Sequence, residues 1–458
     1  MVVGELGFWW RSLGGRPPPR PSLAGPTEAD IAIVGAGLTG LWTAFYLARA
    51  RPDLRIVVLE ANFAGYGAAG RNGGWVVGSL AGAERTWLRS AAADSLARLR
   101  REMWATVDEV GSVLREESID ADFCKAGHLA VAVGPAQLQR VRAQVAAARA
   151  RGVAASDLAW LDARELAGRV RIAGALGAAF SPHAARVHPA RLVAGLARAV
   201  ERRGVTIYES TPVGAVEPGR AVTPAGDVRA RWVVRATEGY TATIAGAGRV
   251  LTPINSSMIV TAPLEPGAWQ QIGWSAPAVI GDAANVYAYL QRTADGRIAI
   301  GGRGVPYRFA SRTGGDGATA ESTIAELRAR LAQLFPSLAG VEIEQAWSGV
   351  LGVTRDWCPV VAADAAQRLA WAGGYVGEGV AAANLAGRTL SDLLLGERSE
   401  LTSLAWVARA PRRWEPEPLR WTAIRAVYAL YRRADRLEAR SGRMSRLAAL
   451  VDRATGRV

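Results

Sequence analysis

The chain has 458 residues and half of them are hydrophobic, so it is long enough to bury one large core or two domains. Its formal net charge of +14 is typical of proteins that bind nucleic acids or anionic membranes, but Lys125 is the single lysine and the arginines are spread along the whole sequence. We therefore attribute most of the charge to compositional bias and expect no nucleic-acid partner. Two cysteines exclude a disulfide framework, and neither a signal sequence nor an apolar run long enough to cross a membrane is recognisable, so we expect a soluble, cytoplasmic protein.

Residues 30–41, DIAIVGAGLTGL, predict the first turn of a nucleotide-binding βαβ unit. An apolar strand over 31–34 leads through a G-x-G-x-x-G turn into a helix. The first glycine permits the tight turn, the second lets the backbone approach a pyrophosphate, and the third lets helix and strand pack closely, while the helix N-terminus faces the phosphates. The positions assigned to this contact are Gly35, Ala36, Gly37, Leu38, Thr39 and Gly40.

A second strand over 55–60 ends at Glu60, about twenty residues past the last glycine, where a carboxylate accepts hydrogen bonds from the ribose of an adenosine. We assign the neighbouring Ala61 to the same contact. Small residues then dominate 65–74, which lets backbone amides approach a large flat ligand beyond the pyrophosphate. This stretch favours FAD over a nicotinamide dinucleotide, and a flexible glycine linker is its alternative interpretation.

The remaining predicted elements do not continue a simple βαβ repeat. Long helical stretches flank a strand over 127–133, and a block of strands over 252–303 contains a hairpin turn at Asp295 and Gly296. The predicted helices cover 83–117, 135–151, 191–203, 320–335 and 380–395, and further strands cover 205–209 and 341–350. This order indicates two interleaved domains.

The tail from Arg409 onward is the densest basic region of the chain. Apolar and basic residues alternate at helical spacing over 419–434, and a second amphipathic segment follows over 444–451. One interpretation is a helix pair that packs on the body and leaves a solvated basic face. The other is peripheral contact of this face with an anionic membrane or an acidic partner.

Several motifs taken together resemble one family. The segment GAAGRNGGWV resembles a loop of FAD-dependent oxidoreductases of the D-amino acid oxidase superfamily, particularly the gamma-glutamylputrescine oxidase-like members. The resemblance extends over most of the chain, in the order 67–76, 186–213, 232–240, 347–361 and 372–394.

The resemblance implies an α/β fold in which a Rossmann-like FAD-binding domain is interleaved with an α+β substrate domain built on an antiparallel sheet. A helical C-terminal tail follows. The expected FAD-binding domain covers 27–90, 180–250 and 345–398, the substrate domain covers 91–179 and 251–344, and the basic helical extension covers 399–458.

The resemblance also implies further contacts to FAD. The first glycine-rich loop would meet the flavin ring, Val213 resembles the position whose backbone meets the adenine, and the late glycine block would close over the pyrimidine side of the flavin. The residues are Gly67, Ala68, Arg71, Asn72, Gly73 and Gly74 in the first loop, and Gly374, Tyr375, Gly377, Glu378, Gly379 and Val380 in the late block.

Related monomeric sarcosine oxidases bond their flavin to a cysteine in the strand before the late block. The rough equivalent here is Gly349, and Cys358 lies too far along the chain to replace it. We therefore expect FAD to be bound without a covalent bond.

The implied activity is hydride transfer to flavin N5 from the carbon of an amine or amino acid. This chemistry needs orientation and a dry pocket rather than a catalytic triad, and the three histidines lack zinc-binding spacing, so no metal is expected. Two alternatives stay open: a flavoprotein dehydrogenase of the same fold that oxidises a hydroxyl of a hydroxy acid or glycerol phosphate, and a basic polyanion-binding protein. The electron acceptor is oxygen or another carrier, because Lys125 does not match the oxygen-activating lysine of related oxidases.

Substrate contacts are expected from the central strands. Tyr287, Tyr289 and Gln291 share one face of a strand, and Arg297 and Arg303 lie on the partner strand and at its end. We expect Tyr287 and Tyr289 to form an aromatic wall and Arg303 to bind a carboxylate or phosphonate. A core or solvent-facing role is the alternative for these positions.

Trp347, Arg355 and Asp356 are further candidates for the rim of the pocket. The alternative for the last two is a buried ion pair between neighbours.

Overall fold

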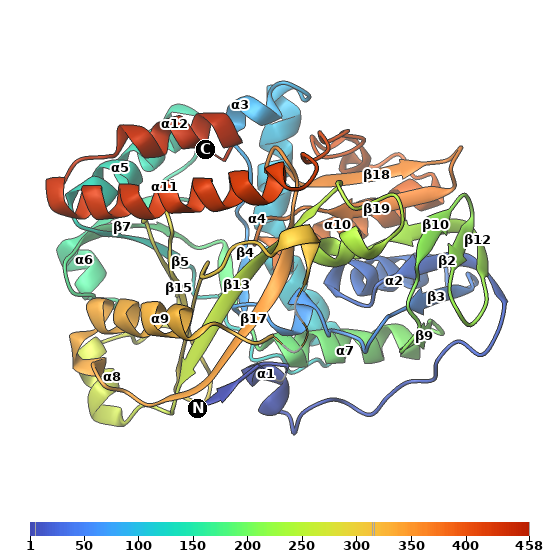
Figure 1. The fold of residues 1–458 in the computed structure, drawn as a ribbon, viewed down its shortest axis with the longest axis horizontal. Coiled ribbons are helices and arrows are strands. Elements are labelled where there is room, and N and C mark those ends of the chain that lie inside the picture. The colour runs from blue at the N-terminus through green and yellow to red at the C-terminus, as the bar shows by residue number, and fades with distance from the viewer. Residues whose placement is uncertain (5, 314, 316, 458) are drawn as a thin grey trace.

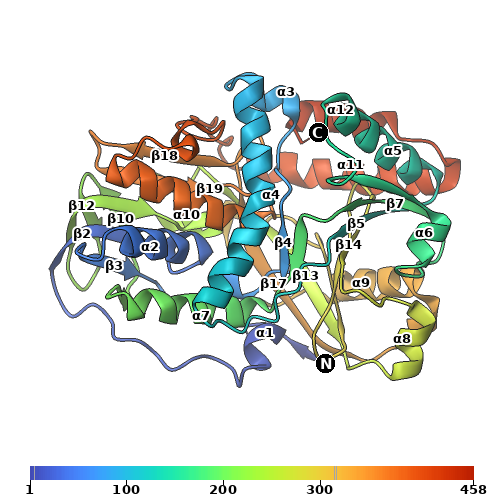
Figure 2. The same ribbon diagram turned by 180° about the vertical axis from the view of Figure 1, so that it is seen from behind.

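The computed structural model describes residues 1–4, 6–313, 315 and 317–457. Figure 1 shows two β-sheets that lie next to each other, each with its own helices, and a chain that passes repeatedly between them. The C-terminal helices α11 (Leu419–Ser441) and α12 (Arg446–Thr455) lie side by side on the part that contains the larger sheet, as both views show (Figure 1 and Figure 2).

The first sheet contains the predicted nucleotide-binding unit. Its strand order is β10-β11-β12-β2-β3-β9, and β19 and β18 extend it beside β12. Strands β12, β2, β3 and β9 run parallel, which requires crossover connections. The strands are β2 (Thr27–Val34), β3 (Ile56–Leu59), β9 (Thr206–Tyr208), β10 (Ala215–Glu217), β11 (Arg220–Val222), β12 (Val228–Arg235), β18 (Val360–Asp364) and β19 (Leu369–Gly373).

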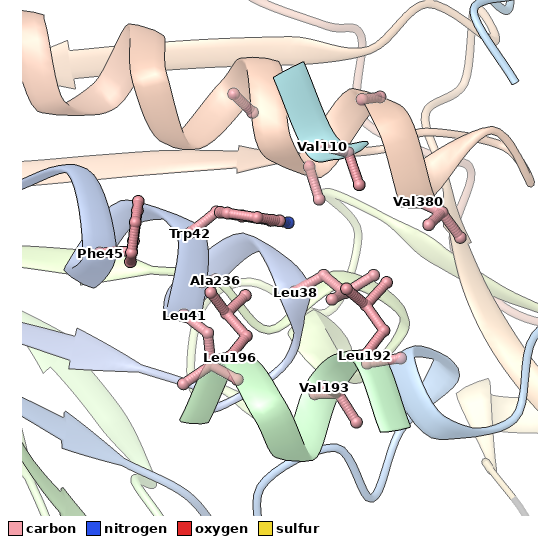
Figure 3. Close-up of a cluster of buried hydrophobic side chains, with 14 of the residues drawn as sticks. Leu38, Leu41, Trp42, Phe45, Val110, Leu192, Val193, Leu196, Ala236 and Val380 are labelled. Carbon is pink, nitrogen blue, oxygen red and sulfur yellow. The ribbon is translucent and has the colours of Figure 1, made fainter. Parts of the chain in front are cut away.

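Helices on this sheet share one apolar core. Trp42 and Phe45 on α2 are fully buried, and Gly387 on α10 lies so close to α2 that a Cβ there would be 2.7 Å from the Cβ of Trp42. The close contact of these helices fixes where the N-termini of α2 and α10 lie. Figure 3 shows the cluster, to which Leu38, Leu41, Trp42 and Phe45 of α2 (Leu38–Ala50), Leu192, Val193 and Leu196 of α7 (Pro189–Arg202), Val110 of α4 (Ala93–Glu116) and Val380 of α10 (Gly379–Leu395) contribute.

The second sheet has nine strands in the order β1-β17-β13-β16-β15-β14-β5-β7-β6 and is mainly antiparallel. Buried leucines of α9 pack with Ile259, Ile298 and Ile300 of its strands in a separate core. The elements are β1 (Val2–Val3), β5 (His128–Val133), β6 (Ala159–Asp162), β7 (Ala175–Ser181), β13 (Thr252–Thr261), β14 (Val279–Asp282), β15 (Tyr289–Arg292), β16 (Ile298–Gly302), β17 (Ile343–Val353), α8 (Pro266–Ile272) and α9 (Glu321–Leu334).

The other elements connect the two sheets, and one of them differs from expectation. The helix expected over 83–117 is two helices, α3 (Glu84–Trp87) and α4, separated by a turn at 88–92. The remaining elements are β4 (Trp75–Val77), β8 (Ala184–Arg186), α1 (Phe8–Arg11), α5 (Pro135–Ala150), α6 (Ala163–Ala167), and the 3-10 helices η1 (Ala68–Gly70), η2 (Glu238–Thr243), η3 (Phe309–Ser311), η4 (Pro336–Leu338) and η5 (Glu400–Ser403).

The boundary expected at residue 345 falls inside a strand. Strand β17 pairs with β13 from Ile343 to Val353, so its whole length lies in the nine-stranded sheet. The chain returns to the first sheet only at β18. The domain boundaries as a whole stay a prediction.

The C-terminal tail forms the expected pair of helices, and α11 extends to Ser441, where Gly442 adopts a left-handed conformation that ends it. Within the part of the chain that the structure describes, no helix is long and apolar enough to cross a membrane.

Candidate functional site

The turn between β2 and α2 has the geometry that the glycine spacing requires. Gly35 has a φ of 105°, and a Cβ at Gly40 would lie 2.0 Å from the carbonyl oxygen of Gly35. A Cβ at Gly37, by contrast, would meet no atom of the described chain within 4 Å. Gly37 is also the N-cap of α2 and supplies no side-chain cap, so the first amides of this helix are available to an anion beside an open space.

Glu60 lies at the end of β3, as expected, and is tied to the turn. Its carboxylate accepts hydrogen bonds from the amides of Ala36 and Asn62, each at 2.9 Å. Burial raises the pKa of Glu60. Ala61 follows it and is exposed, whereas Val213 is buried in the apolar cluster that lines β2 and β3. The structure therefore brings all of these residues to one edge of the first sheet.

The loop after β3 is folded by its own asparagine. The Asn72 amide nitrogen donates to the carbonyls of Ala68 and Ala69, and its Oδ1 accepts from the amide of Gly74 at 2.7 Å. Arg71 is buried, with its guanidinium 4.4 Å from the centre of the Tyr66 ring. The loop is thus ordered by internal hydrogen bonds and is not a free glycine linker.

Two glycines of this loop lie against the second sheet. A Cβ at Gly73 would be 2.7 Å from the Tyr289 ring, and one at Gly74 would be 2.0 Å from Oε1 of Gln291. Gln291 also donates to the carbonyl of Val187. On the other side, a Cβ at Gly67 would be 3.1 Å from the Tyr240 ring. Absence of side chains therefore lets this loop pass between the two sheets.

The late glycine block returns to the first turn. The side-chain oxygens of Tyr375 and Thr39 lie 3.0 Å apart, and Val380 packs in the same core as Leu38. Gly374 and Gly377 have φ angles of 77° and 115°, which side chains rarely permit. These residues therefore form a backbone-lined wall. Helix α10 begins at Gly379, and its N-cap, Glu378, makes no side-chain cap.

Glu238 is a part of this wall that the sequence analysis missed. It follows β12, has a φ of 41°, and accepts a hydrogen bond from the Tyr375 amide at 3.0 Å. Burial raises its pKa to about 7. Its signal in the sequence is weak: an acidic residue three positions after a strand, within the segment 232–240 that resembles the family.

The three expected substrate residues are brought together beside the two glycine loops. Arg303 is 7% exposed and donates from Nη2 to the Val376 carbonyl at 3.3 Å. A Cβ at Gly377 would lie 3.5 Å from Arg303 Nη2 and 3.9 Å from the hydroxyl of Tyr287. The rings of Tyr287 and Tyr289 are 6.2 Å apart. Tyr287 precedes β15 rather than lying in it, because the strand begins at Tyr289.

Other candidates lie elsewhere. The alternative prediction of an ion pair between Arg355 and Asp356 is wrong. Arg355 pairs with Glu415 and Asp356 pairs with Arg409, because the tail supplies both partners. Trp347 is fully buried and donates its indole hydrogen to the carbonyl of Arg71 at 2.9 Å.

Arg297 is held in ion pairs with Asp295 and Glu344, and Lys125 pairs with Asp108. Among the residues that the structure describes, no group of three side chains could hold a metal ion.

The residues fit the expected FAD as an extended ligand. The open side of Gly37 and the amides of α2 suit the pyrophosphate, and Glu60 suits the ribose at the edge of the sheet. The late block, in which Gly377 is exposed, would offer its backbone to a flat ring.

Comparisons with known proteins agree with this geometry. The sequence profile of the family described as "FAD dependent oxidoreductase" matches residues 30–393. The probable oxidoreductase OrdL of Rhizobium meliloti (strain 1021) is 29% identical over 414 residues, which cover 86% of this chain and 90% of OrdL. Gamma-glutamylputrescine oxidoreductase of Escherichia coli (strain K12) is 29% identical over 392 residues, which cover 83% of this chain and 87% of that protein.

The structure of glycine oxidase from Geobacillus kaustophilus has a TM-score of 0.69 to this chain at 21% identity, covering 84% of this chain and 100% of the other, and so shares its fold. These matches confirm the resemblance to the D-amino acid oxidase superfamily and its gamma-glutamylputrescine oxidase-like members. This chain therefore belongs to the FAD dependent oxidoreductase family, and it is an enzyme that uses FAD.

Proposed function

We propose that this enzyme oxidises a carbon–nitrogen bond of a small amine or amino acid. When bound, FAD supplies at N5 the acceptor for a hydride from the substrate carbon. The names of two similar proteins, a gamma-glutamylputrescine oxidoreductase and a glycine oxidase, support an amine or amino-acid substrate.

The burial and the unsatisfied hydrogen bonding of Arg303 are the observation that supports an amino acid as the substrate. Its guanidinium is buried, and Nη1 meets no hydrogen-bond acceptor within the described residues. A buried charge with an unsatisfied donor is costly, and a substrate carboxylate would supply the missing acceptor. Gly377, beside this guanidinium, is exposed and has no side chain to fill the space. We therefore assign Arg303 to the substrate carboxylate.

Tyr287 and Tyr289 would orient the amine. Burial raises the pKa of both phenols, to about 12 for Tyr289, so both stay neutral at physiological pH. Neutral aromatic walls exclude water and accommodate an uncharged amine, the form from which a hydride can leave. The role of these residues is orientation rather than proton transfer.

We also propose that FAD is held without a covalent bond. Gly349 stands where the resemblance places the flavin-linking cysteine, and Cys358 faces Gly82, where a Cβ would be 2.4 Å from its sulfur. Burial raises the pKa of the Cys358 thiol to about 12, which keeps it unreactive. Denaturation followed by filtration should release all of the yellow colour; colour that stays with the polypeptide would contradict this proposal.

The proposed function is tested by anaerobic reduction of the purified enzyme. Amines, amino acids and hydroxy acids are added separately, and bleaching of the flavin absorbance is recorded. Bleaching by a member of the first two classes is expected. Bleaching by hydroxy acids alone would assign the enzyme to the alternative reaction at a hydroxyl, and a protein without FAD would overturn both. Reoxidation of the bleached enzyme by air, compared with a soluble quinone, identifies the acceptor as oxygen or another carrier.

We further propose that the outer face of the α11–α12 pair contacts anionic membrane surfaces. The three acidic residues of this pair are engaged in internal hydrogen bonds: Asp435 with Asn285, Glu438 with Arg140, and Asp452 with Tyr431. Charge complementarity with an anionic bilayer therefore supports the proposal. The exposed residues of the pair and of the turn between its helices include Arg425, Arg433, Arg436, Arg440, Arg443, Arg446 and Arg453, with Leu437, Met444 and Leu450 among them.

Sedimentation with vesicles tests this contact. Vesicles rich in phosphatidylglycerol should carry the enzyme down, whereas phosphatidylcholine vesicles should not, and the triple change of Arg433, Arg436 and Arg440 to Gln should weaken binding. Equal binding of duplex DNA, or no binding to either vesicle, would contradict the proposal. The expected cytoplasmic location stays a prediction.

A further inference from the structure

One face of α11 contacts the chain segments that carry the assigned substrate residues. Ile424, Tyr428, Arg432 and Asp435 recur at intervals of four, four and three residues, so they share one side of the helix. This helix lies beyond residue 393, where the family profile ends. The contacts described below are therefore additions of this chain to the part that matches the family.

Asp435 holds the turn that leads into Tyr287. One carboxylate oxygen accepts from the backbone amide and the side-chain amide of Asn285, at 2.8 and 2.9 Å. The other accepts from the amide of Val286 at 2.9 Å. These three hydrogen bonds to one side chain fix the backbone immediately before Tyr287.

The two preceding turns of α11 contact the residues next to Arg303. Arg432 donates from Nη2 to the carbonyl of Gly304, the residue after Arg303, at 2.6 Å. Tyr428 and Ile424 pack in one buried cluster with Val376, whose carbonyl accepts the hydrogen bond from Arg303. The helix therefore fixes both the backbone of Arg303 and the residue that orients its guanidinium.

We propose that this face of α11 is a positioning element of the substrate site, in which Asp435 sets the place of Tyr287 and Arg432 sets that of Arg303. The inference rests on the proposed function, which assigns Tyr287 and Arg303 to the substrate. Neither Asp435 nor Arg432 needs to touch the substrate. Their effect on catalysis is transmitted through the residues that they hold.

The change Asp435→Asn tests the first half of this proposal. An amide keeps the size of the side chain but has one acceptor oxygen, so it cannot accept from the Asn285 and Val286 amides on separate oxygens. We expect kcat/KM to fall about tenfold, mainly through KM, with FAD content retained. Ala429→Gln, at an exposed position of α11 that has no assigned role, is the matched control and should leave kcat/KM unchanged.

A double-mutant cycle distinguishes positioning from general stability. If Asp435 acts through Tyr287, the effects of Asp435→Asn and Tyr287→Ala on kcat/KM should not add, because loss of the ring removes the group through which Asp435 acts. Additive losses would overturn the proposal. For the second half, Arg432→Lys should retain most of the activity that Arg432→Ala loses, since the ammonium can still donate to Gly304.

Amide hydrogen exchange supplies a readout that needs no turnover. Asp435→Asn should speed exchange over 285–287, and the control Ala429→Gln should not. Unchanged exchange, or faster exchange with an unaltered KM, would overturn the positioning role. Failure of every amine and amino acid to reduce the unsubstituted enzyme would instead count against the proposed function, and the two failures are thus distinguishable.

Discussion

The side-chain oxygens of Thr39 and Tyr375 lie 3.0 Å apart, although 336 residues separate the two positions in the chain. Thr39 belongs to the first turn of α2, and Tyr375 to the late glycine block. Both side chains are buried. Their hydrogen bond therefore ties together the segment that we assign to the pyrophosphate and the segment that we assign to the flavin ring.

Tyr375→Phe removes this hydrogen bond and keeps the ring. The Thr39 hydroxyl then loses a buried partner, at a cost of about 1 kcal/mol, and we expect FAD to bind about fivefold more weakly. Titration of the apoprotein with FAD measures this change. Tyr431→Phe removes a hydroxyl that bonds to Asp452 in the tail, and should leave FAD affinity unaltered. Equal weakening in both variants would show a general loss of stability.

The carboxyl of Glu238 should make stability depend on pH. Burial raises its pKa in the folded state to about 7, above the unfolded value of 4.5, so the folded protein binds the additional proton between these limits. This contribution to stability is complete below pH 4.5 and is lost as pH rises through 7. Urea unfolding at several pH values should show the decline, up to about 3 kcal/mol, and Glu238→Gln should flatten it. A parallel slope in both proteins would contradict the assignment.

The sequence predicted the nucleotide-binding turn because its constraints are local. The atoms that exclude a side chain at Gly40 belong to Gly35, five residues away, and the Glu60 carboxylate bonds to the same turn. Spacing along the chain therefore carries the information. Strand alternation likewise placed Tyr289 and Gln291 on the face that meets Gly73 and Gly74.

The ion pairs of Arg355 and Asp356, and the contact between Glu238 and Tyr375, depend on segments that are remote in sequence. Arg355 and Asp356 are neighbours, yet their partners are Glu415 and Arg409, because the tail packs on either side of the turn that contains them. Glu238 meets Tyr375, 137 residues away, because β12 and β19 pair in one sheet. Such pairs follow from tertiary packing, which charge and spacing in one sequence do not specify.

Gly37→Ala should separate folding from cofactor binding. Its added methyl group would meet no protein atom within 4 Å, so the free energy of unfolding of the apoprotein should change by less than about 1 kcal/mol. The methyl group would occupy the space assigned to the pyrophosphate, and we expect the purified variant to contain little FAD. Absorbance and thermal unfolding measure the two effects. Gly267→Ala, which also meets open space but on α8, should keep its FAD.

Gly40→Ala should give the opposite result. Its methyl group would lie 2.0 Å from the Gly35 carbonyl oxygen, so α2 would have to move away from β2. We expect a loss of stability of about 2–4 kcal/mol in the apoprotein itself, measured by urea unfolding. A variant as stable as the parent would show that this contact can relax.

Arg303→Met should change the choice of substrate. The methionine fills a similar volume but cannot pair with a carboxylate, so an amino acid would lose about 3 kcal/mol of binding, or about a hundredfold in kcat/KM. The corresponding amine without a carboxylate makes no such contact and should be oxidised as well as before or better, because the uncompensated buried charge is gone. The ratio of kcat/KM for the two substrates is the measurement, and it is insensitive to the amount of folded enzyme. An equal loss for both substrates would show that Arg303 supports the fold of the site and does not bind the carboxylate.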